Sequence, residues 1–237
     1  MNSPLLPLDR RLLRNRRGAL ALAAAVAALV PICWIVIQLN GSFPGDSHFI
    51  SWMRHPHPSE PLSFFAHIFA LLGNPIVAPL CVAIVWVLID DDLGPRYGAL
   101  VLAAVGAVAI NALLKAILGP TPLETSVRGS SASGNFPSGH VVYITSLCGL
   151  LGWFAIARGH RATFAAMLLL ILGMGPFRIL DGAHWPSDVL AGYALGLAWT
   201  IVVLVVGLPW AAGQKQTENY PGQPDIEATI LGRIRAG

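Results

Sequence analysis

Residues 19–39 of the chain read ALALAAAVAALVPICWIVIQL, and none of these side chains is charged. About 20 consecutive, mainly apolar residues are enough for an α-helix to cross the hydrocarbon core of a membrane. A cleavable signal peptide has an apolar core of only roughly 7–15 residues. The stretch therefore predicts an uncleaved membrane anchor near the start of an integral membrane protein.

The composition of the whole chain agrees with a membrane protein. Of its 237 residues, 55% are hydrophobic and 11% are charged, and the mean hydropathy is +0.65. A soluble domain carries about 25% charged residues. Because disordered chains, coiled coils and nucleic-acid-binding proteins depend on charged surfaces, the composition excludes these classes and excludes nucleic acid as a partner.

Five further apolar runs are predicted to cross the membrane, at residues 75–89, 97–118, 139–157, 163–180 and 189–208. Residues 62–72 are apolar but too short to span, and Gly73-Asn74-Pro75 separates them from the next run. We interpret them as an interfacial or re-entrant helix, with one long kinked helix as the alternative. The predicted fold is an all-α, polytopic membrane helix bundle with six transmembrane helices and a short interfacial helix.

The distribution of Lys and Arg predicts the orientation of the bundle. Six spans put both termini on one side, and short cytoplasmic loops are enriched in Lys and Arg. With the termini inside, that side holds eleven of the fifteen Lys and Arg residues. The sequence predicts a multi-pass protein of the cell membrane, with a basic cytoplasmic segment at 1–18, a membrane domain at 19–209 and a flexible cytoplasmic tail at 210–237.

The predicted outer face combines cations with the start of a helix, because the connections between spans three and four and between spans five and six emerge there. Lys115 ends the third span, and Arg178 lies near the end of the fifth. Ser138 and Gly139 open the fourth. Free backbone N–H groups and the helix dipole make a helix start suitable for anions, and Arg can bind phosphate through two parallel hydrogen bonds. These four residues are predicted to bind phosphate.

Two histidines and a carboxylate on the same face are residue types suited to phosphoryl transfer. His184 and Asp188 lie four positions apart across a helix start. An imidazole so placed can attack phosphorus while the carboxylate orients its other nitrogen. His140, one turn into the fourth span, is suited to protonate the leaving oxygen. The histidines of residues 48–57 lack the spacing of metal ligands, so no metal site is predicted.

These stretches resemble the second and third signature motifs of the type 2 phosphatidic acid phosphatase family, part of the phosphatase/haloperoxidase superfamily. Residues 137–140, which read PSGH, match the second motif. The third is matched by Arg178, five residues, His184, three residues and Asp188. The serine that usually precedes the arginine of the third motif is replaced by Phe177.

The resemblance covers residues 99–199 and implies a fold of six spans with cytoplasmic termini and an outward-facing site. It also implies a phosphatase that needs no metal or other cofactor and that forms a phosphohistidine. By motif position, His184 is the nucleophile, Asp188 its orienting carboxylate and His140 the general acid. The residues that the resemblance assigns to phosphate binding are Lys115, Ser138, Gly139 and Arg178.

The first family motif, a lysine followed by six residues and Arg-Pro, is incomplete. After Lys115, Pro122 and Leu123 occupy the Arg-Pro positions, or Thr121 and Pro122 do if one residue is deleted. The arginine is missing in either alignment, and removing one donor aimed at a transition state can cost about 100–1000-fold in rate. Arg128 lies in the same loop, and we predict that it supplies the missing guanidinium.

The favoured function is hydrolysis of a phosphate monoester or diphosphate on a lipid at the outer leaflet, with the lipid phosphate and membrane lipids as partners. The resemblance implies polyprenyl diphosphates such as undecaprenyl diphosphate, phosphatidic acid, phosphatidylglycerol phosphate and lipid A phosphates, and the breadth of the family favours undecaprenyl diphosphate. One alternative is a lipid phosphotransferase that uses the same intermediate. Another is a non-catalytic lipid-binding or transport protein, which the missing arginine would permit. The sequence does not determine the oligomeric state.

Overall fold

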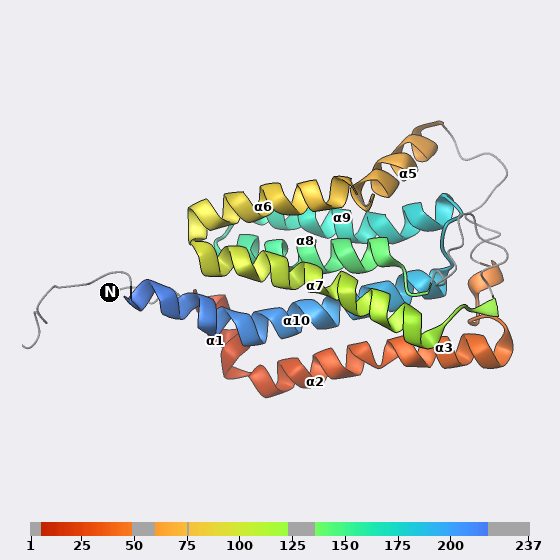
Figure 1. Cartoon of the computed structure of the whole chain (residues 1–237), viewed down its shortest axis with the longest axis horizontal. Helices are drawn as coiled ribbons and strands as arrows, with labels where there is room; N and C mark the ends of the chain where they lie inside the picture. The colour runs from red at the N-terminus through yellow and green to blue at the C-terminus, as the bar shows by residue number, and fades with distance from the viewer. Residues whose placement is uncertain (1–5, 49–59, 75, 123–135, 218–237) are drawn as a thin grey trace, which may run out of the picture.

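The computed structural model describes residues 6–48, 60–74, 76–122 and 136–217, and among them no strand occurs. The long helices lie side by side along one axis (Figure 1). In chain order, the helices are α1 (Pro7–Arg14), α2 (Arg16–Ala27), α3 (Leu29–Asn40), α5 (Glu60–Leu72), α6 (Val77–Leu93), α7 (Pro95–Leu118), α8 (Gly139–Ala157), α9 (Arg161–Leu180) and α10 (Pro186–Thr217). The predicted all-α bundle is confirmed.

Five helical stretches are long and apolar enough to cross a membrane, and each coincides with a predicted span. The first stretch is α2 with α3, and the others lie on α7, α8, α9 and α10. Their bounds are Arg16–Asn40, Pro95–Leu118, Gly139–Ala157, Arg161–Leu180 and Pro186–Gly213. A sixth candidate is the pair α5 and α6, so the polytopic character of the predicted bundle is confirmed.

The break between α5 and α6 occurs where the sequence has Gly73-Asn74-Pro75. The two helices are bent by 67° at this point, and α5 leaves the line of α6 in Figure 1. The side-chain Oδ1 of Asn74 accepts a hydrogen bond from the backbone N–H of Ile76 at 2.9 Å. The backbone carbonyl of Asn74 accepts a hydrogen bond from the Ala78 N–H at 2.8 Å, so Asn74 binds the chain on either side of the first residue of α6. The helices α5 and α6 are thus joined at a bend, and whether they form a re-entrant pair or one broken span stays a prediction.

Helices α8 and α10 form the centre of the bundle. They bury 67% and 61% of their apolar stretches inside the protein, against 22–28% for the other unbroken candidate spans. Small residues allow them to pack closely: a Cβ on Gly192 would lie 2.9 Å from Val141 Cβ, and one on Gly196 would lie 2.7 Å from Thr145 Cβ. The Ala- and Gly-rich run of α10 therefore serves packing within the chain.

Helical structure extends beyond the predicted membrane spans at both described ends of the chain. Helix α10 continues to Thr217, past residue 208, where the predicted span ends. Arg96 supports this extension, because its Nη1 donates to the Trp210 carbonyl at 2.9 Å and its guanidinium lies 5.3 Å from the Trp210 ring centroid. Helix α1, within the predicted basic segment, packs on the bundle through Asp9, whose Oδ1 accepts from Trp153 Nε1 at 2.8 Å.

The helix ends divide between the two ends of the bundle. In Figure 1, α1 and the last turns of α10 lie at the left, while the end of α7 and the starts of α8 and α10 lie at the right. The chemistry-bearing residues named above therefore meet at the end opposite the described termini. Which end faces the cytoplasm stays a prediction from the charge distribution.

Candidate active site

The start of α8 lies within the candidate site. Ser138 is the N-cap residue in an extended conformation, and it makes no side-chain bond to the first turn of α8. Its backbone N–H donates to the Asp188 carbonyl at 3.0 Å, which fixes the start of α8 against the start of α10. The Ser138 side chain is fully buried, and its Oγ has no hydrogen-bond partner among the described residues.

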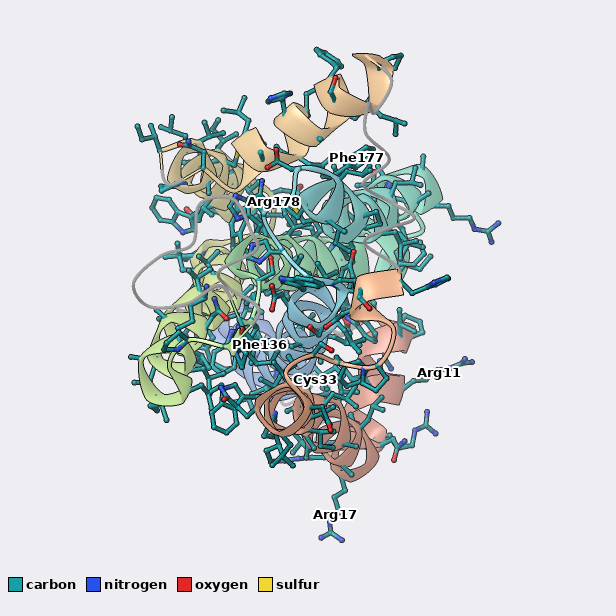
Figure 2. All side chains as sticks on the ribbon, turned by 90° about the vertical axis from the view of Figure 1, so that its right-hand side faces the viewer. Arg11, Arg17, Cys33, Phe136, Phe177 and Arg178 are labelled. Atoms are coloured by element: carbon teal, nitrogen blue, oxygen red, sulfur yellow. The ribbon has the colours of Figure 1, made fainter. Side chains whose placement is uncertain are left out.

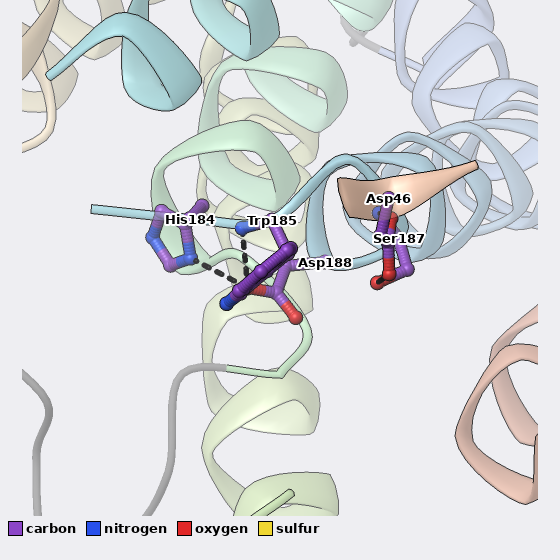
Figure 3. A network of polar contacts seen from close by, with 5 residues as sticks. All are labelled: Asp46, His184, Trp185, Ser187 and Asp188. Atoms are coloured by element: carbon purple, nitrogen blue, oxygen red, sulfur yellow. Dashed lines mark hydrogen bonds and ion pairs between the residues drawn. The ribbon is translucent and has the colours of Figure 1, made fainter. Parts of the chain in front are cut away.

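The predicted pair of His184 and Asp188 is brought together at the start of α10 (Figure 3). Asp188 reaches back over the first turn, and its Oδ2 accepts from the Trp185 backbone N–H at 2.9 Å. The same Oδ2 lies 3.4 Å from His184 Nδ1. This is longer than an ideal hydrogen bond, although such bonds often tighten only when a substrate is bound. The contact leaves His184 Nε2 as the nitrogen for reaction.

Burial determines the ionisation of His184. Its side chain is 8% exposed and that of Asp188 is 1% exposed. Burial is the main effect and lowers the pKa of His184 from its ordinary value, because desolvation disfavours the imidazolium. Asp188 raises this pKa, while the positive charges of Arg178 and Lys115 lower it. The net direction is downward, which favours the neutral imidazole that a nucleophile requires.

Arg178 lies at the end of α9 and is buried within the bundle, whereas Arg11 and Arg17 extend away from it (Figure 2). Its Nη1 forms an ion pair with Asp181 Oδ2 at 2.8 Å. The Nε of the same guanidinium is buried and has no hydrogen-bond partner in the described part of the chain. Asp181 thus holds Arg178 in place and leaves a donor available.

His140 is seated against the break between α5 and α6. It hydrogen-bonds the backbone of Ala70 and interacts electrostatically with Arg178, His184 and Lys115. A Cβ on Gly73 would lie 2.0 Å from His140 Cδ2, so the absence of a side chain at residue 73 makes room for the ring. The predicted general acid therefore lies in the same cluster as the predicted nucleophile.

Asn111 also belongs to this cluster, although the sequence analysis did not select it. It lies on α7 one turn before Lys115, with 3% of its surface exposed. Its Nδ2 is 3.3 Å from the position of a Cβ on Gly139. The amide thus faces the start of α8. A polar side chain on the helix face of the predicted phosphate-binding lysine was the signal that could have identified it.

The unsatisfied polar atoms of the described residues concentrate at this place. Among all described residues, seven buried side-chain N or O atoms have no hydrogen-bond partner, and five of the seven belong to the cluster. The five are Asn111 Oδ1, Ser138 Oγ, Arg178 Nε, His184 Nδ1 and Asp188 Oδ1. A buried polar group without a partner costs about 1–3 kcal/mol. Five such atoms from four helix ends are typical of a site that receives a polar ligand.

The first-motif region is only partly described. Thr121 is buried near the end of α7. Arg128 and Leu123 lie outside the described residues, so the predicted role of Arg128 stays a prediction.

The replacement at Phe177 has a structural reason, because its ring stacks on Phe69 with centroids 4.7 Å apart and so joins α9 to α5. Among the described residues, no group of three or more His, Cys, Asp or Glu could hold a metal ion.

Two curated relatives of this chain are both lipid phosphatases. Lipid A 1-phosphatase of Rhizobium johnstonii is 35% identical over 79 residues, which is 33% of this chain and 30% of that protein. Lipid A 1-phosphatase of Rhizobium etli is 34% identical over 83 residues, covering 35% of this chain and 33% of that protein. The matched segments thus span about a third of these curated relatives.

A solved structure shows the same fold over most of the chain. It is a transmembrane PAP2 type phosphatidylglycerolphosphate phosphatase from Bacillus subtilis, with a TM-score of 0.66 at 15% identity. The superposition covers 85% of this chain and 98% of that one. Residues 96–210 match the family model of the PAP2 superfamily, a range that includes every residue of the cluster and the predicted extent of the resemblance. Residues 96–210 are therefore similar to the PAP2 superfamily, the family that the sequence motifs resemble.

Proposed function

We propose that this protein is an integral membrane lipid phosphatase that hydrolyses a phosphate monoester or diphosphate through a phosphohistidine at His184. The observation that carries the proposal is the group of five buried, unpartnered polar atoms around the His184–Asp188 pair. Two of these atoms, Ser138 Oγ and Arg178 Nε, are donors that the oxygen atoms of a phosphate can satisfy. His184 Nδ1 faces Asp188, and the remaining two atoms are acceptors. The similarity of residues 96–210 to the PAP2 superfamily supports the same reaction class.

Phosphate is bound between the start of α8 and two cations. The side chain of Ser138, the N-cap residue, makes no capping bond to α8, so the N–H groups of the first turn, beginning at Gly139, are available to the ligand. Ser138 Oγ and Arg178 Nε donate to its oxygens, and Lys115 adds positive charge. The Asn111 amide supplies a neutral donor beside Gly139. The predicted contribution of Arg128 would add to these groups in place of the first-motif arginine.

The reaction then proceeds in two displacements. His184 Nε2 attacks phosphorus while the bond from phosphorus to the leaving oxygen breaks, and that oxygen takes a proton from His140. Asp188 stabilises the positively charged phosphoimidazole through Nδ1–H. In the second step a water molecule gives a proton to His140 and its oxygen attacks phosphorus, and the Nε2–P bond breaks. Inorganic phosphate leaves and His140 is protonated again.

The surroundings of His140 favour a substrate with a hydrocarbon chain. A cavity of about 670 Å³ lies among α6, α7 and α8, and its wall includes Gly139 and His140. The rest of the lining is mostly apolar, with Val82, Trp86 and Val105 among the residues. An apolar cavity that adjoins a few polar groups is the usual form of a ligand site. A lipid chain placed there would hold its phosphate at the start of α8.

The names of the relatives indicate which lipid phosphates should be tested as substrates. The two Rhizobium proteins are named for removal of the 1-phosphate of lipid A, and the structural relative is named for phosphatidylglycerolphosphate. We therefore place lipid A 1-phosphate and phosphatidylglycerol phosphate beside undecaprenyl diphosphate and phosphatidic acid. The charge distribution supports the proposal that this chemistry occurs at the outer face of the cell membrane, opposite the described termini.

The test is phosphate release by the purified full-length protein from these four lipids. We expect release from at least one of them, loss of release in His184→Ala, insensitivity to EDTA and inhibition by vanadate. His160→Ala is the matched control, because His160 is exposed and makes no side-chain capping bond to α9. Release that requires added magnesium would contradict the mechanism. No release from any lipid, with His184→Ala indistinguishable from wild type, would establish a non-catalytic protein, and phosphate found on an added acceptor lipid would establish a phosphotransferase.

A further inference from the structure

Asp46 is a buried carboxylate that no catalytic role described above uses. It follows α3, outside the residues that match the family, and 1% of its surface is exposed. Its Oδ1 accepts from the Ser187 backbone N–H at 3.0 Å, and its Oδ2 accepts from Ser187 Oγ at 2.8 Å. Oδ2 also accepts from the Phe43 backbone N–H at 3.1 Å. Figure 3 shows Asp46 and Ser187 beside the His184–Asp188 pair.

These bonds cap the helix that carries the orienting carboxylate. The first N–H groups of a helix have no partner within it, and Pro186, the first residue of α10, has no N–H. Ser187 therefore presents the first backbone donor of α10, and Asp46 accepts from it. The negative carboxylate also interacts favourably with the positive end of the helix dipole. Asp46 thus acts as an N-cap supplied from a distant part of the chain.

The cap lies directly next to the catalytic groups. Asp188 follows Ser187 in the chain, and its carboxylate contacts both the Trp185 N–H and His184 Nδ1. Its carbonyl accepts from Ser138 at the phosphate-binding start of α8. A displacement of Ser187 would therefore change the orientation of His184 and the position of Ser138 together.

The environment of Asp46 is costly for a carboxylate, which argues for a specific purpose. Within the described residues, no Lys or Arg forms an ion pair with it. Burial raises the pKa of Asp46, and the hydrogen bonds from Ser187 and Phe43 lower it. Removing the carboxylate would leave the Ser187 and Phe43 donors without their acceptor, and a buried unsatisfied polar group costs about 1–3 kcal/mol. Two of the three hydrogen bonds come from Ser187, so Asp46 is tied to the start of α10.

We propose that Asp46 is a positioning residue for the phosphatase reaction: through Ser187 it fixes the start of α10, and with it the Asp188 carboxylate that orients His184. The proposal rests on the function proposed above for His184. It makes the segment after the first span a part of the active-site support. The first span then has a role beyond anchoring the chain.

The first test compares the turnover of Asp46→Asn and Asp46→Ala with that of Asp9→Asn. Asp9 is the matched control, because it is also buried and accepts from Trp153 Nε1 and the Leu6 N–H, but on α1 at the opposite end of the bundle. We expect kcat to fall about 10–100-fold in Asp46→Ala, as is usual for groups that orient catalytic ligands. The fall should be smaller in Asp46→Asn, which keeps one acceptor oxygen, with KM nearly unchanged in both. Asp9→Asn should keep the wild-type kcat.

A second test does not depend on turnover. The ring ¹⁵N chemical shifts of His184, assigned by comparison with His184→Gln, report which ring nitrogen carries the proton. We expect the Nδ1–H form in the wild type and in Asp9→Asn, and a mixture of both tautomers in Asp46→Ala. Unchanged His184 shifts in Asp46→Ala would overturn the inference even if the wild type released no phosphate. A normal kcat in Asp46→Ala of an active enzyme would overturn it as well.

Discussion

Gly73→Ala is the substitution that most directly probes the seat of His140. The new Cβ would lie 2.0 Å from His140 Cδ2 and 2.7 Å from Nε2. The φ angle of Gly73 is not in the left-handed region, so the backbone conformation at residue 73 does not disfavour an alanine. The steric conflict with the imidazole is therefore the main consequence of the change.

The size of the effect follows from the displacement. To reach an ordinary contact of 3.4 Å, the ring must move by about 1.4 Å relative to the new methyl group. A misplacement of about 1 Å in an active site can cost about 100-fold in rate, and proton transfer by a positioned acid contributes about 100–10,000-fold. We expect Gly73→Ala to lower kcat about 100-fold on a lipid phosphate. The loss should be smaller on p-nitrophenyl phosphate, whose leaving group needs little protonation.

Gly152→Ala is the matched control for this experiment. It is buried in α8, and a Cβ there would lie 3.5 Å from Phe164, an ordinary contact. Its kcat should equal that of the wild type. The reasoning is refuted if Gly73→Ala retains wild-type kcat while His140→Ala is inactive, because the ring would then tolerate the displacement. An equal loss on both substrates would show that His140 does not act as the acid for the leaving group.

Four further outcomes follow from the same geometry. Because the pKa of His184 is lowered, the nucleophile loses its proton at lower pH than an ordinary histidine, and the acidic limb of the profile of kcat/KM against pH should lie below 6.5, the ordinary His value. Asn111→Ala should weaken inhibition by vanadate about 10-fold or more, since a hydrogen bond to a charged group is worth about 1.5–3 kcal/mol; unchanged inhibition would remove Asn111 from the site. Arg128→Ala should lower turnover or apparent affinity, and if both stay at wild-type values Arg128 does not replace the missing guanidinium. Ser138→Ala removes a buried hydroxyl that has no partner among the described residues, so thermal unfolding should show a gain of about 1 kcal/mol in stability together with reduced activity.

The helices were predictable because their signal is local. An apolar run of sufficient length specifies a span without reference to other parts of the chain, and the runs at 97–118, 139–157 and 163–180 agree with α7, α8 and α9 within a few residues. The end of the last span was predicted less well. The predicted span ends at residue 208, but α10 continues through Pro209, with the Trp210 carbonyl bound by Arg96.

The candidate site was predictable where its residues stand at helix ends that topology brings together. His140, His184 and Asp188 are examples, since their motifs also fix their spacing. Asp46 was not predictable in this way, because it lies 141 positions from Ser187 and its bonds depend on tertiary packing. The role of Gly73 was not predictable for a similar reason, because it depends on contact with the ring of His140, which lies on α8.

The division between chemistry and substrate choice follows from where these residues lie. The groups proposed to bind and transfer phosphate all fall within residues 96–210, the part that the family shares. The cavity beside His140 has one wall on α6, with Ala78, Val82 and Trp86, and this wall lies outside that range. A substitution such as Val82→Phe would reduce the volume available to a lipid chain while leaving the phosphate-binding groups in place. We therefore expect substitutions along α6 to change which lipid chain the cavity accepts and to leave the phosphate-binding groups unaffected.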